Sequence, residues 1–417
     1  LCALNTTTTV YCHTMTDTNT AAPTKTGDTT STSTQTDVVA TPSTTPSLGP
    51  NKTLQPYDRA RSSCAALVQA TNASNVPTTI NVAAIEAYAS ALDVDHVRKV
   101  GSTLAEDGNA TSVALDFPSV EVEAGLIVIM HALDFGGGWR LALHAHTGGA
   151  GAWLTVKAGV EALFTANPTL SAEWLATRTA KDVAELFSLP NDAKAELAPF
   201  VVQLQMVINE VGTSVAKTGA ATVSDWLLAQ LDQASETTPA GSLVDALVQA
   251  FPTTFNDVYV VKTNNGTRTS AEDGDNDDAV QNFSEHAVQF YKKAQLVVGE
   301  LYHRFRAEDS RFDFPDGPRL TAYIDNVICA VCRKLGLIVT SDPLTQRIEE
   351  HELIPRGSLS EVSLRACAMV AVERVAELRQ ADGLTPAELG NYFWGILGKT
   401  PDFRKFTRHA TRDTVFY

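Results

Sequence analysis

The chain has 417 residues, of which 44% are hydrophobic and 19% are charged, which is a globular composition with ample material for a core. Its net charge of -16 argues against direct nucleic-acid binding, and no apolar run reaches the roughly 18 residues needed to cross a membrane. Six cysteines do not form a disulfide framework in so long a chain, and no signal-peptide pattern opens it, so we expect a cytoplasmic protein.

The first 55 residues differ in composition from the rest. They are crowded with Thr, Ser and Pro and contain few large apolar side chains, so burial cannot offset the entropy lost on ordering. We therefore expect residues 1–55 to be a disordered tail. The pattern of residues 56–417 is globular and predicts a single large domain, interrupted by an acidic loop that begins near Asn264.

Most of this domain shows helical periodicity. Amphipathic segments lie near residues 153–165, 179–188, 193–211 and 222–235. Strand patterns are few, and the two best are residues 119–135 and 257–263. The predicted fold class is mainly α, with a minor β-sheet or hairpin.

Capping residues predict three further helices in the C-terminal half. Ser284 suits the N-cap of a helix whose apolar spacing continues to residue 305. Ser358 and Glu361 have capping-box spacing before a segment that is apolar nearly all round, which predicts a buried helix. A third helix is predicted from residue 320 onwards, with Gly336 as its C-cap.

One acid stands inside the apolar stretch LTAYIDNVICAVCRKLGLI, which starts at Leu320. Burying the carboxylate of Asp325 there costs several kcal/mol unless something compensates. In a helix, Asp325 shares a stripe with Cys329 and Cys332. The two cysteines are half of a zinc site without a second half, and a redox pair would lie at a helix start, so we interpret them as core residues.

Three other motifs give weaker signals. The acidic loop fails the EF-hand pattern, because Asp and Ser occupy the positions that require Gly and Glu. His144 and His146 suit a metal pair at a strand end, but no later set of ligands completes it. The glycines before Trp153 predict a turn and a helix start, where free N–H groups approach an anion or a ring; a flexible loop is an equal alternative.

Several segments together, in this order, resemble the queuosine salvage family, the queuosine 5′-phosphate N-glycosidases. The matching segments are FYKKAQLVVGELY, LTAYIDNVICAVCRKLGLI, ELIPRGSLSEVSLRACAMVAVERV, NYFWGIL and RHATRDTVFY, with weaker matches in RARSSCAALV and ALDFGGGWR. The resemblance covers residues 57–417. It implies hydrolysis of the C–N bond between the 7-deazaguanine base queuine and ribose phosphate, by a monomer and without cofactor or metal.

The resemblance also implies roles for two charged residues. Asp325 would stabilise or attack the oxocarbenium-like sugar of the transition state, and a dry environment strengthens that interaction. Lys292 would pair with Asp325 and orient the carboxylate or the attacking water, although periodicity alone places Lys292 and Lys293 on a solvated face. A 7-deaza base has no N7 to protonate, so we expect hydrogen bonds to the base edge to matter more.

The loop from residue 131 to residue 139 departs from the family pattern Asp-Thr-Leu-Asn-Phe-x-Phe-Trp. Here His131 replaces the first Asp, Asp134 replaces Asn, and three glycines precede Trp139. If this loop contacts the base, both altered residues are candidate substrate contacts and the specificity could differ. Phe135, Trp139 and Trp153 are candidates for stacking on the base, with ordinary core aromatics as the alternative.

Five more residues complete the candidate site. Glu361 and Arg365 have i,i+4 spacing in a matching segment, where we favour an ion pair that supports the site over direct catalysis. Tyr323 and Asn326, on either side of the acid, are candidate substrate contacts. Arg412 is a candidate for the substrate phosphate, or for folding the chain end back onto the core.

The sequence thus predicts a hydrolase that releases queuine from queuosine 5′-monophosphate for salvage into tRNA modification. The partner is a small molecule, and neither nucleic acid nor membrane is bound directly. The altered loop leaves two alternatives open, a non-catalytic nucleotide- or nucleobase-binding homologue and an N-glycosidase for a different modified nucleotide. The retained Lys292 and Asp325 argue against the binding protein, which has no need of a buried acid.

Overall fold

The computed structural model describes residues 54–71, 76–99, 115–267, 281–395, 398 and 400–417. The tail predicted for residues 1–55 lies outside this part of the chain except for its last two positions. Most of the predicted acidic loop also lies outside it. The described residues belong to one compact unit.

The predicted fold class is confirmed, because the described part is mainly helical and its strands form two antiparallel pairs. The α-helices are α1 (Pro56–Thr71), α2 (Val82–Ala91), α4 (Val120–Ala132), α5 (Arg140–Thr147), α6 (Ala152–Ala166), α7 (Ala172–Ala176), α8 (Ala180–Leu186), α9 (Ala198–Lys217), α10 (Val223–Gln233), α11 (Pro239–Ala250), α12 (Pro252–Phe255), α13 (Lys292–Phe305), α14 (Asn326–Lys334), α15 (Asp342–Glu349), α16 (Leu359–Leu378), α17 (Pro386–Gly395) and α18 (Pro401–Arg404). The 3-10 helices are η1 (Gly137–Trp139), η2 (Ser310–Phe312), η3 (Gly317–Arg319) and η4 (Gln380–Asp382). The strands are β1 (Thr78–Ile80), β2 (Val258–Thr267), β3 (Gln281–Gln289) and β4 (Ile338–Thr340).

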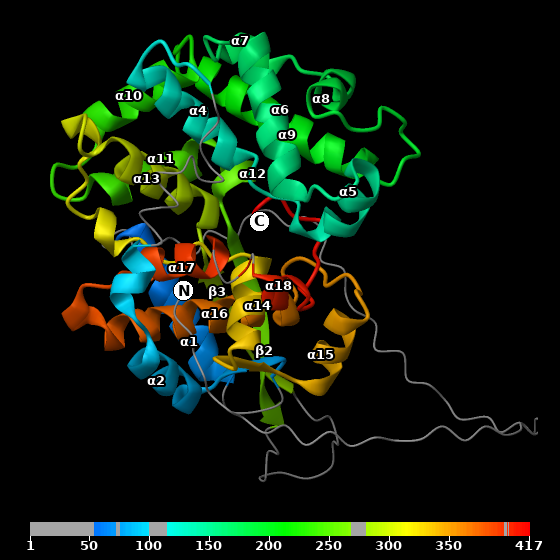
Figure 1. Cartoon of the computed structure of the whole chain (residues 1–417), viewed down its shortest axis with the longest axis vertical. Helices are drawn as coiled ribbons and strands as arrows, with labels where there is room; N and C mark the ends of the chain where they lie inside the picture. Colours follow the sequence, from blue (N-terminus) through cyan, green and yellow to red (C-terminus); the bar gives the residue numbers. More distant parts are fainter. Residues whose placement is uncertain (1–53, 72–75, 100–114, 268–280, 396–397, 399) are drawn as a thin grey trace, which may run out of the picture. The chain divides into compact units, whose positions relative to one another are not determined.

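The helices pack in two groups. Helix α4 contacts α6, α9, α10 and α13 in one group, and α16 contacts α1, α2, α14 and α17 in the other, which Figure 1 shows above and below one another. Pairs β1–β4 and β2–β3 both pack against α16 in the lower group. Helix α16 is buried along most of its length, as predicted, and begins at Ser358, whose Oγ accepts a hydrogen bond from the Glu361 N–H at 3.3 Å.

Residues 119–135 form helix α4, so the predicted strand is wrong. Ser119 caps the helix by accepting a hydrogen bond from Val122, and Glu121 and Glu123 suit the positive end of the helix dipole. The apolar run is continuous because helices surround α4, so no amphipathic stripe marks it. The other predicted strand, residues 257–263, is confirmed in β2.

Residues 284–289 belong to strand β3, so the helix predicted from Ser284 starts too early. In β3, Val288 pairs with Tyr259 and Ala287 with Val260, and the strand finds in β2 a partner that local capping signals do not reveal. Tyr291 then adopts a left-handed conformation with a φ of 52°, which turns the chain from the strand into α13. The helix therefore begins at Lys292.

Among the described residues, no single helix is both long and apolar enough to cross a membrane. Helix α4 and the segment Gly137–Thr147, which are bent by 58° relative to each other, meet the length and composition criteria only as a pair.

Candidate active site

Asp325 is the N-cap of helix α14 rather than a residue inside a helix, which corrects the predicted start at residue 320. Its Oδ1 accepts hydrogen bonds from the N–H groups of Val327 and Ile328, both at 2.9 Å. The preceding chain is not helical, because Thr321 is held by two hydrogen bonds to the side chain of Gln295. Asp325 is 7% exposed, and both cap hydrogen bonds end on Oδ1, so Oδ2 remains available to a ligand.

Lys292 forms its ion pair with Asp134, not with Asp325 as predicted. The Lys292 ammonium lies at the first turn of α13 and also donates to the Asp134 carbonyl at 3.4 Å, while Asp325 turns one oxygen into its own helix. Lys292 and Lys293 are both buried, contrary to the solvated face that periodicity predicted. Lys293 donates to the Ala132 carbonyl, so both lysines secure the end of α4.

The two carboxylates have opposite electrostatic environments. Burial raises the pKa of Asp325, and the charge of Lys292 offsets this only in part. Burial also raises the pKa of Asp134, but the charges of Lys292 and His131 and the hydrogen bond from Lys292 outweigh it, so this pKa lies below its usual value. The site therefore holds a paired carboxylate just after α4 and a less neutralised one at the N-cap of α14.

His131 lies next to this ion pair with both ring nitrogens buried and without hydrogen-bond partners. Its ring stacks on Trp153 at 6.5 Å between centroids, and Trp153 meets Trp394 edge to face at 6.2 Å. Trp153 Nε1 is also buried without a partner. Buried polar atoms without a partner are costly, and a polar planar ligand beside the Lys292–Asp134 pair would satisfy those of His131 and Trp153.

Folding is expected to become less favourable at acidic pH because of His131. Burial lowers its pKa to about 4, so between pH 6.5 and pH 4 the unfolded chain binds a proton that the folded chain excludes. The free energy of unfolding should fall by about 3 kcal/mol over this window as the pH is lowered. His131→Phe removes this contribution, and urea unfolding at several pH values should give a shallower slope. A pH dependence of stability unchanged by His131→Phe would contradict the role of His131. His409, whose pKa burial lowers to about 3, adds the same pH dependence in both proteins.

The three glycines before Trp139 allow close packing rather than access for a ligand. Gly136 has a φ of 107°, in the left-handed region that favours glycine. A Cβ atom at Gly137 would lie 2.5 Å from Asn326 Nδ2, and one at Gly138 would lie 2.2 Å from the Thr411 carbonyl oxygen. The turn is thus neither flexible nor open, although α6 does begin near Trp153 as predicted.

Gly138→Ala should destabilise the fold, because its new methyl group meets backbone that cannot move aside. We expect a loss of about 1–3 kcal/mol, the usual cost of overpacking. Chemical unfolding measures it, with Gly151→Ala as the matched control, because a Cβ there meets only the side chain of His144 at 3.3 Å. Equal stability of the two variants would argue against close packing of the turn on residue 411.

Arg365 links the segments that carry the charged residues. Its guanidinium donates to both carboxylate oxygens of Asp257, at 3.1 and 2.6 Å, and to Glu361 at 3.2 Å. It also donates to the carbonyl of Ile324, the residue before Asp325, and stacks on Phe290, two residues before Lys292. The predicted ion pair is confirmed, and because Glu361 and Arg365 are fully buried, the structure places them behind the site.

The remaining predicted residues are engaged by the protein. Tyr323 points its hydroxyl at Gly299 of α13, and Asn326 donates to the His409 carbonyl at 3.3 Å. Phe135 packs edge to face on Phe200. Trp139 Nε1 donates a hydrogen bond to the Gln203 side chain at 3.1 Å, and Arg412 forms an ion pair with Glu196 at 2.8 Å. Asn326 is thus the neighbour of Asp325, whereas the other residues contact the surrounding protein.

The predicted fold-back of the chain end is confirmed. Tyr417 is buried, and its carbonyl accepts a hydrogen bond from the Gly136 N–H at 3.2 Å. The C-terminal segment, residues 408–417, therefore closes over the turn of residues 136–138.

His144 and His146 lie on helix α5, not at a strand end. His144 is next to Gly151, and His146 Nε2 donates a hydrogen bond to the Ser188 carbonyl at 2.9 Å. Among the described residues, no group of three His, Cys, Asp or Glu side chains is arranged to hold a metal ion. Cys329 and Cys332 are buried free thiols, as the core interpretation predicted.

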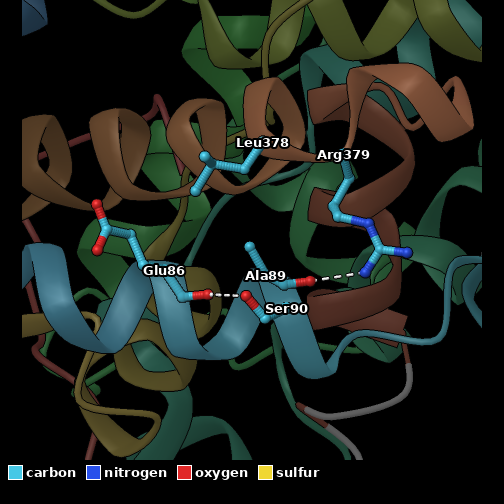
Figure 2. A pocket seen from close by; sticks show the side chains of 5 residues that line it. All are labelled: Glu86, Ala89, Ser90, Leu378 and Arg379. Atoms are coloured by element: carbon cyan, nitrogen blue, oxygen red, sulfur yellow. Dashed lines mark hydrogen bonds between the residues drawn. The ribbon is translucent and has the colours of Figure 1, made fainter.

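A surface pocket lies elsewhere, between α2 and the end of α16 (Figure 2). Leu378 in its wall is thirteen residues beyond Arg365, which is about 20 Å along the helix. Arg379 donates to the carbonyl of Ala89 at 2.6 Å (Figure 2). It also donates to the carbonyl of Leu92 at 2.6 Å and so caps the C-terminus of α2. The polar groups of this pocket thus stabilise α2, and we do not assign it a reaction.

Three residues near the site were not singled out from the sequence. Asp257 begins a strand pattern, but its buried partner lies 108 residues away. Lys293 was weighed only as a solvated neighbour of Lys292. Trp394 lies in NYFWGIL, one of the segments that carry the family resemblance, and this is the signal that could have found it.

Comparison with known proteins agrees with the resemblance. Residues 275–417 match the family model described as queuosine salvage protein. A queuosine 5′-phosphate N-glycosylase/hydrolase of Sphaerobacter thermophilus is 29% identical over 265 residues, which cover 63% of this chain and 70% of that protein. Proteins of the same name from Nematostella vectensis and Dictyostelium discoideum are 27% and 29% identical, over 43% and 40% of their own lengths. The chain is therefore a relative of the queuosine salvage proteins, and the resemblance recognised in its sequence is confirmed.

Proposed function

We propose that this protein hydrolyses the N-glycosidic bond of queuosine 5′-phosphate and releases queuine for salvage into tRNA modification. The observation that carries the proposal is the buried cluster of Asp325, Asp134 and Lys292, in a chain related to proteins named for this reaction. We further propose that it acts as a cytoplasmic monomer on the free nucleotide, without direct nucleic-acid or membrane binding.

In this proposal Asp325 acts at the anomeric carbon. Breaking the C–N bond leaves positive charge on the ribose, and a carboxylate beside it stabilises that charge or attacks it. The two cap hydrogen bonds fix Oδ1, so Oδ2 is the oxygen presented to the sugar. Burial makes the interaction stronger than in water, because the local dielectric is low.

The Lys292–Asp134 pair positions the other reactants. Lys292 keeps Asp134 ionised next to Asp325, and this second carboxylate is placed to orient water for attack on the sugar. His131 is neutral above pH 4, so its ring nitrogens can donate to and accept from the base edge. Trp153 is the aromatic surface best placed for stacking on the base, because it already stacks on His131.

The test is release of free queuine from queuosine 5′-phosphate by purified protein, with and without a chelator. Release that persists with chelator supports the proposal, and dependence on added metal would contradict the cofactor-free form of it. A panel of other nucleoside monophosphates tests the alternative substrate, which the replacement of the family Asp by His131 motivates. Tight binding by calorimetry with no base released over hours would favour the binding-protein alternative.

A further inference from the structure

Three arginines lie together without acidic partners in a chain that is otherwise acidic. They are Arg140 at the start of α5, Arg404 at the end of α18, and Arg408, which follows it. Among the described residues, no carboxylate oxygen lies within 4.0 Å of their guanidinium nitrogens. Eleven other arginines each form such a pair. The cluster therefore concentrates positive charge that no carboxylate of the described part neutralises by direct contact.

The cluster is next to Asp325 through its neighbour Asn326. Arg140 follows η1, in which Gly137 packs directly on the Asn326 amide. Arg408 precedes His409, whose carbonyl accepts the hydrogen bond from Asn326 Nδ2. Helix α18 contacts α14, which brings Arg404 to the same helix. The three side chains thus come from separate elements: the segments next to Arg140 and Arg408 both contact Asn326 at the N-terminal end of α14, whereas α18 packs near its other end, where Phe403 contacts Lys334.

The three charges are held close enough to repel one another. Burial lowers the pKa of Arg140, and the charge of Arg404 lowers it further. Burial also lowers the pKa of Arg408, as do the charges of Arg140 and Arg404, while the charge of Asp325 raises it. The pKa of His144 is lowered by burial and by all three arginines. A bound dianion would relieve this repulsion, and the guanidinium fork matches the oxygens of a phosphate.

We propose that Arg140, Arg404 and Arg408 bind the 5′-phosphate of the nucleotide and so place its ribose beside Asp325. This inference rests on the proposed function and adds the phosphate subsite. It replaces the phosphate role expected for Arg412, whose guanidinium already pairs with Glu196 and donates to the Gly138 carbonyl at 3.2 Å. Within the described part of the chain, Arg408 donates one hydrogen bond, from Nη2 to the Gly398 carbonyl at 3.2 Å, so its other N–H groups are available.

The experiment compares queuosine 5′-phosphate with queuosine, which lacks the phosphate, as substrates of the wild type and of Arg140→Gln, Arg404→Gln and the double variant. The readout is the ratio of kcat/KM for the nucleotide to kcat/KM for the nucleoside. We expect each single variant to lower this ratio roughly tenfold, the lower end of the effect of a charge-assisted hydrogen bond, and the double variant to lower it further. Arg374→Gln is the control, because that exposed arginine pairs only with Glu377, and its ratio should equal that of the wild type.

Two outcomes would overturn the inference while leaving the proposed function intact. One is a wild type that releases base equally well from nucleotide and nucleoside. The other is that Arg412→Gln lowers the nucleotide-to-nucleoside ratio of kcat/KM while Arg140→Gln and Arg404→Gln leave it at the wild-type value. A thermal-shift titration with inorganic phosphate separates the two proposals. Stabilisation of the wild type that disappears in the double variant supports the subsite even if no base is released from either substrate, whereas absence of stabilisation in the wild type counts against it.

Discussion

Asp325→Asn should lower turnover of queuosine 5′-phosphate by roughly a thousandfold, the scale of removing one preorganised electrostatic group from an active site. The substitution keeps the shape of the side chain and removes the charge that the oxocarbenium-like sugar requires. It also keeps an oxygen for the caps to Val327 and Ile328, because Asn is as good an N-cap as Asp. We therefore expect the free energy of unfolding to stay within about 1 kcal/mol of the wild type.

Single-turnover release of base, together with chemical unfolding, separates chemistry from folding in this variant. Asp325→Ala should lose turnover equally and in addition lose the cap, at a cost of about 1 kcal/mol. Asp309→Asn is the control for the cap, since Asp309 also caps a helical turn, η2, through its side chain, while pairing with Arg311. A strongly destabilised Asp325→Asn protein that still released base at the wild-type rate would refute the catalytic role.

Arg365→Met should cause the largest loss of stability of any single substitution considered for this protein. It leaves the buried carboxylates of Asp257 and Glu361 without their cation, and breaking a buried ion pair in this way costs about 3–5 kcal/mol. Burial already raises the pKa of Glu361 despite the nearby guanidinium. Glu361 should therefore take up a proton in the variant, and the loss should be smaller at pH 5 than at pH 7.

Urea unfolding at both pH values measures this effect. Arg365→Lys should be intermediate, because it restores the charge but not the bidentate contact with Asp257. Adding Asp257→Asn to Arg365→Met should recover part of the loss by removing one unpaired charge. If Arg365→Met unfolds like the wild type at pH 7, the guanidinium does not hold the segments of Ile324 and Phe290 together.

Helix ends with strong local signals could be predicted from the sequence. Ser358 at the start of α16 and Gly336 after α14 are examples, because the capping atoms belong to the same short segment. Helix α4 could not be recognised, since complete burial removes the amphipathic pattern on which the prediction depends. Residues 284–289 could not be placed either, because they form a strand only where β2 offers its edge.

The site itself could be predicted in part. The buried acid at position 325 was evident from its apolar neighbours, and the family resemblance drew attention to Lys292. Its partner was not evident, because the ion pair joins residues 158 positions apart and is set by the packing of α13 on α4. The arginine cluster was not evident for the same reason, since three residues separated along the chain converge only in the fold.

The contacts of the C-terminal segment have a consequence for biosynthesis. Residues 136–138 dock on Thr411 and Tyr417, and strand β1 pairs with β4, so segments made early in translation must wait for segments made more than 250 residues later. At about 5–20 residues per second, that wait lasts on the order of ten seconds or more. The turn, the surroundings of Asn326 and the arginine cluster therefore assemble only after the last residues emerge from the ribosome. During this interval the surroundings of Asn326 stay uncovered in the nascent chain, and chaperones have access to them.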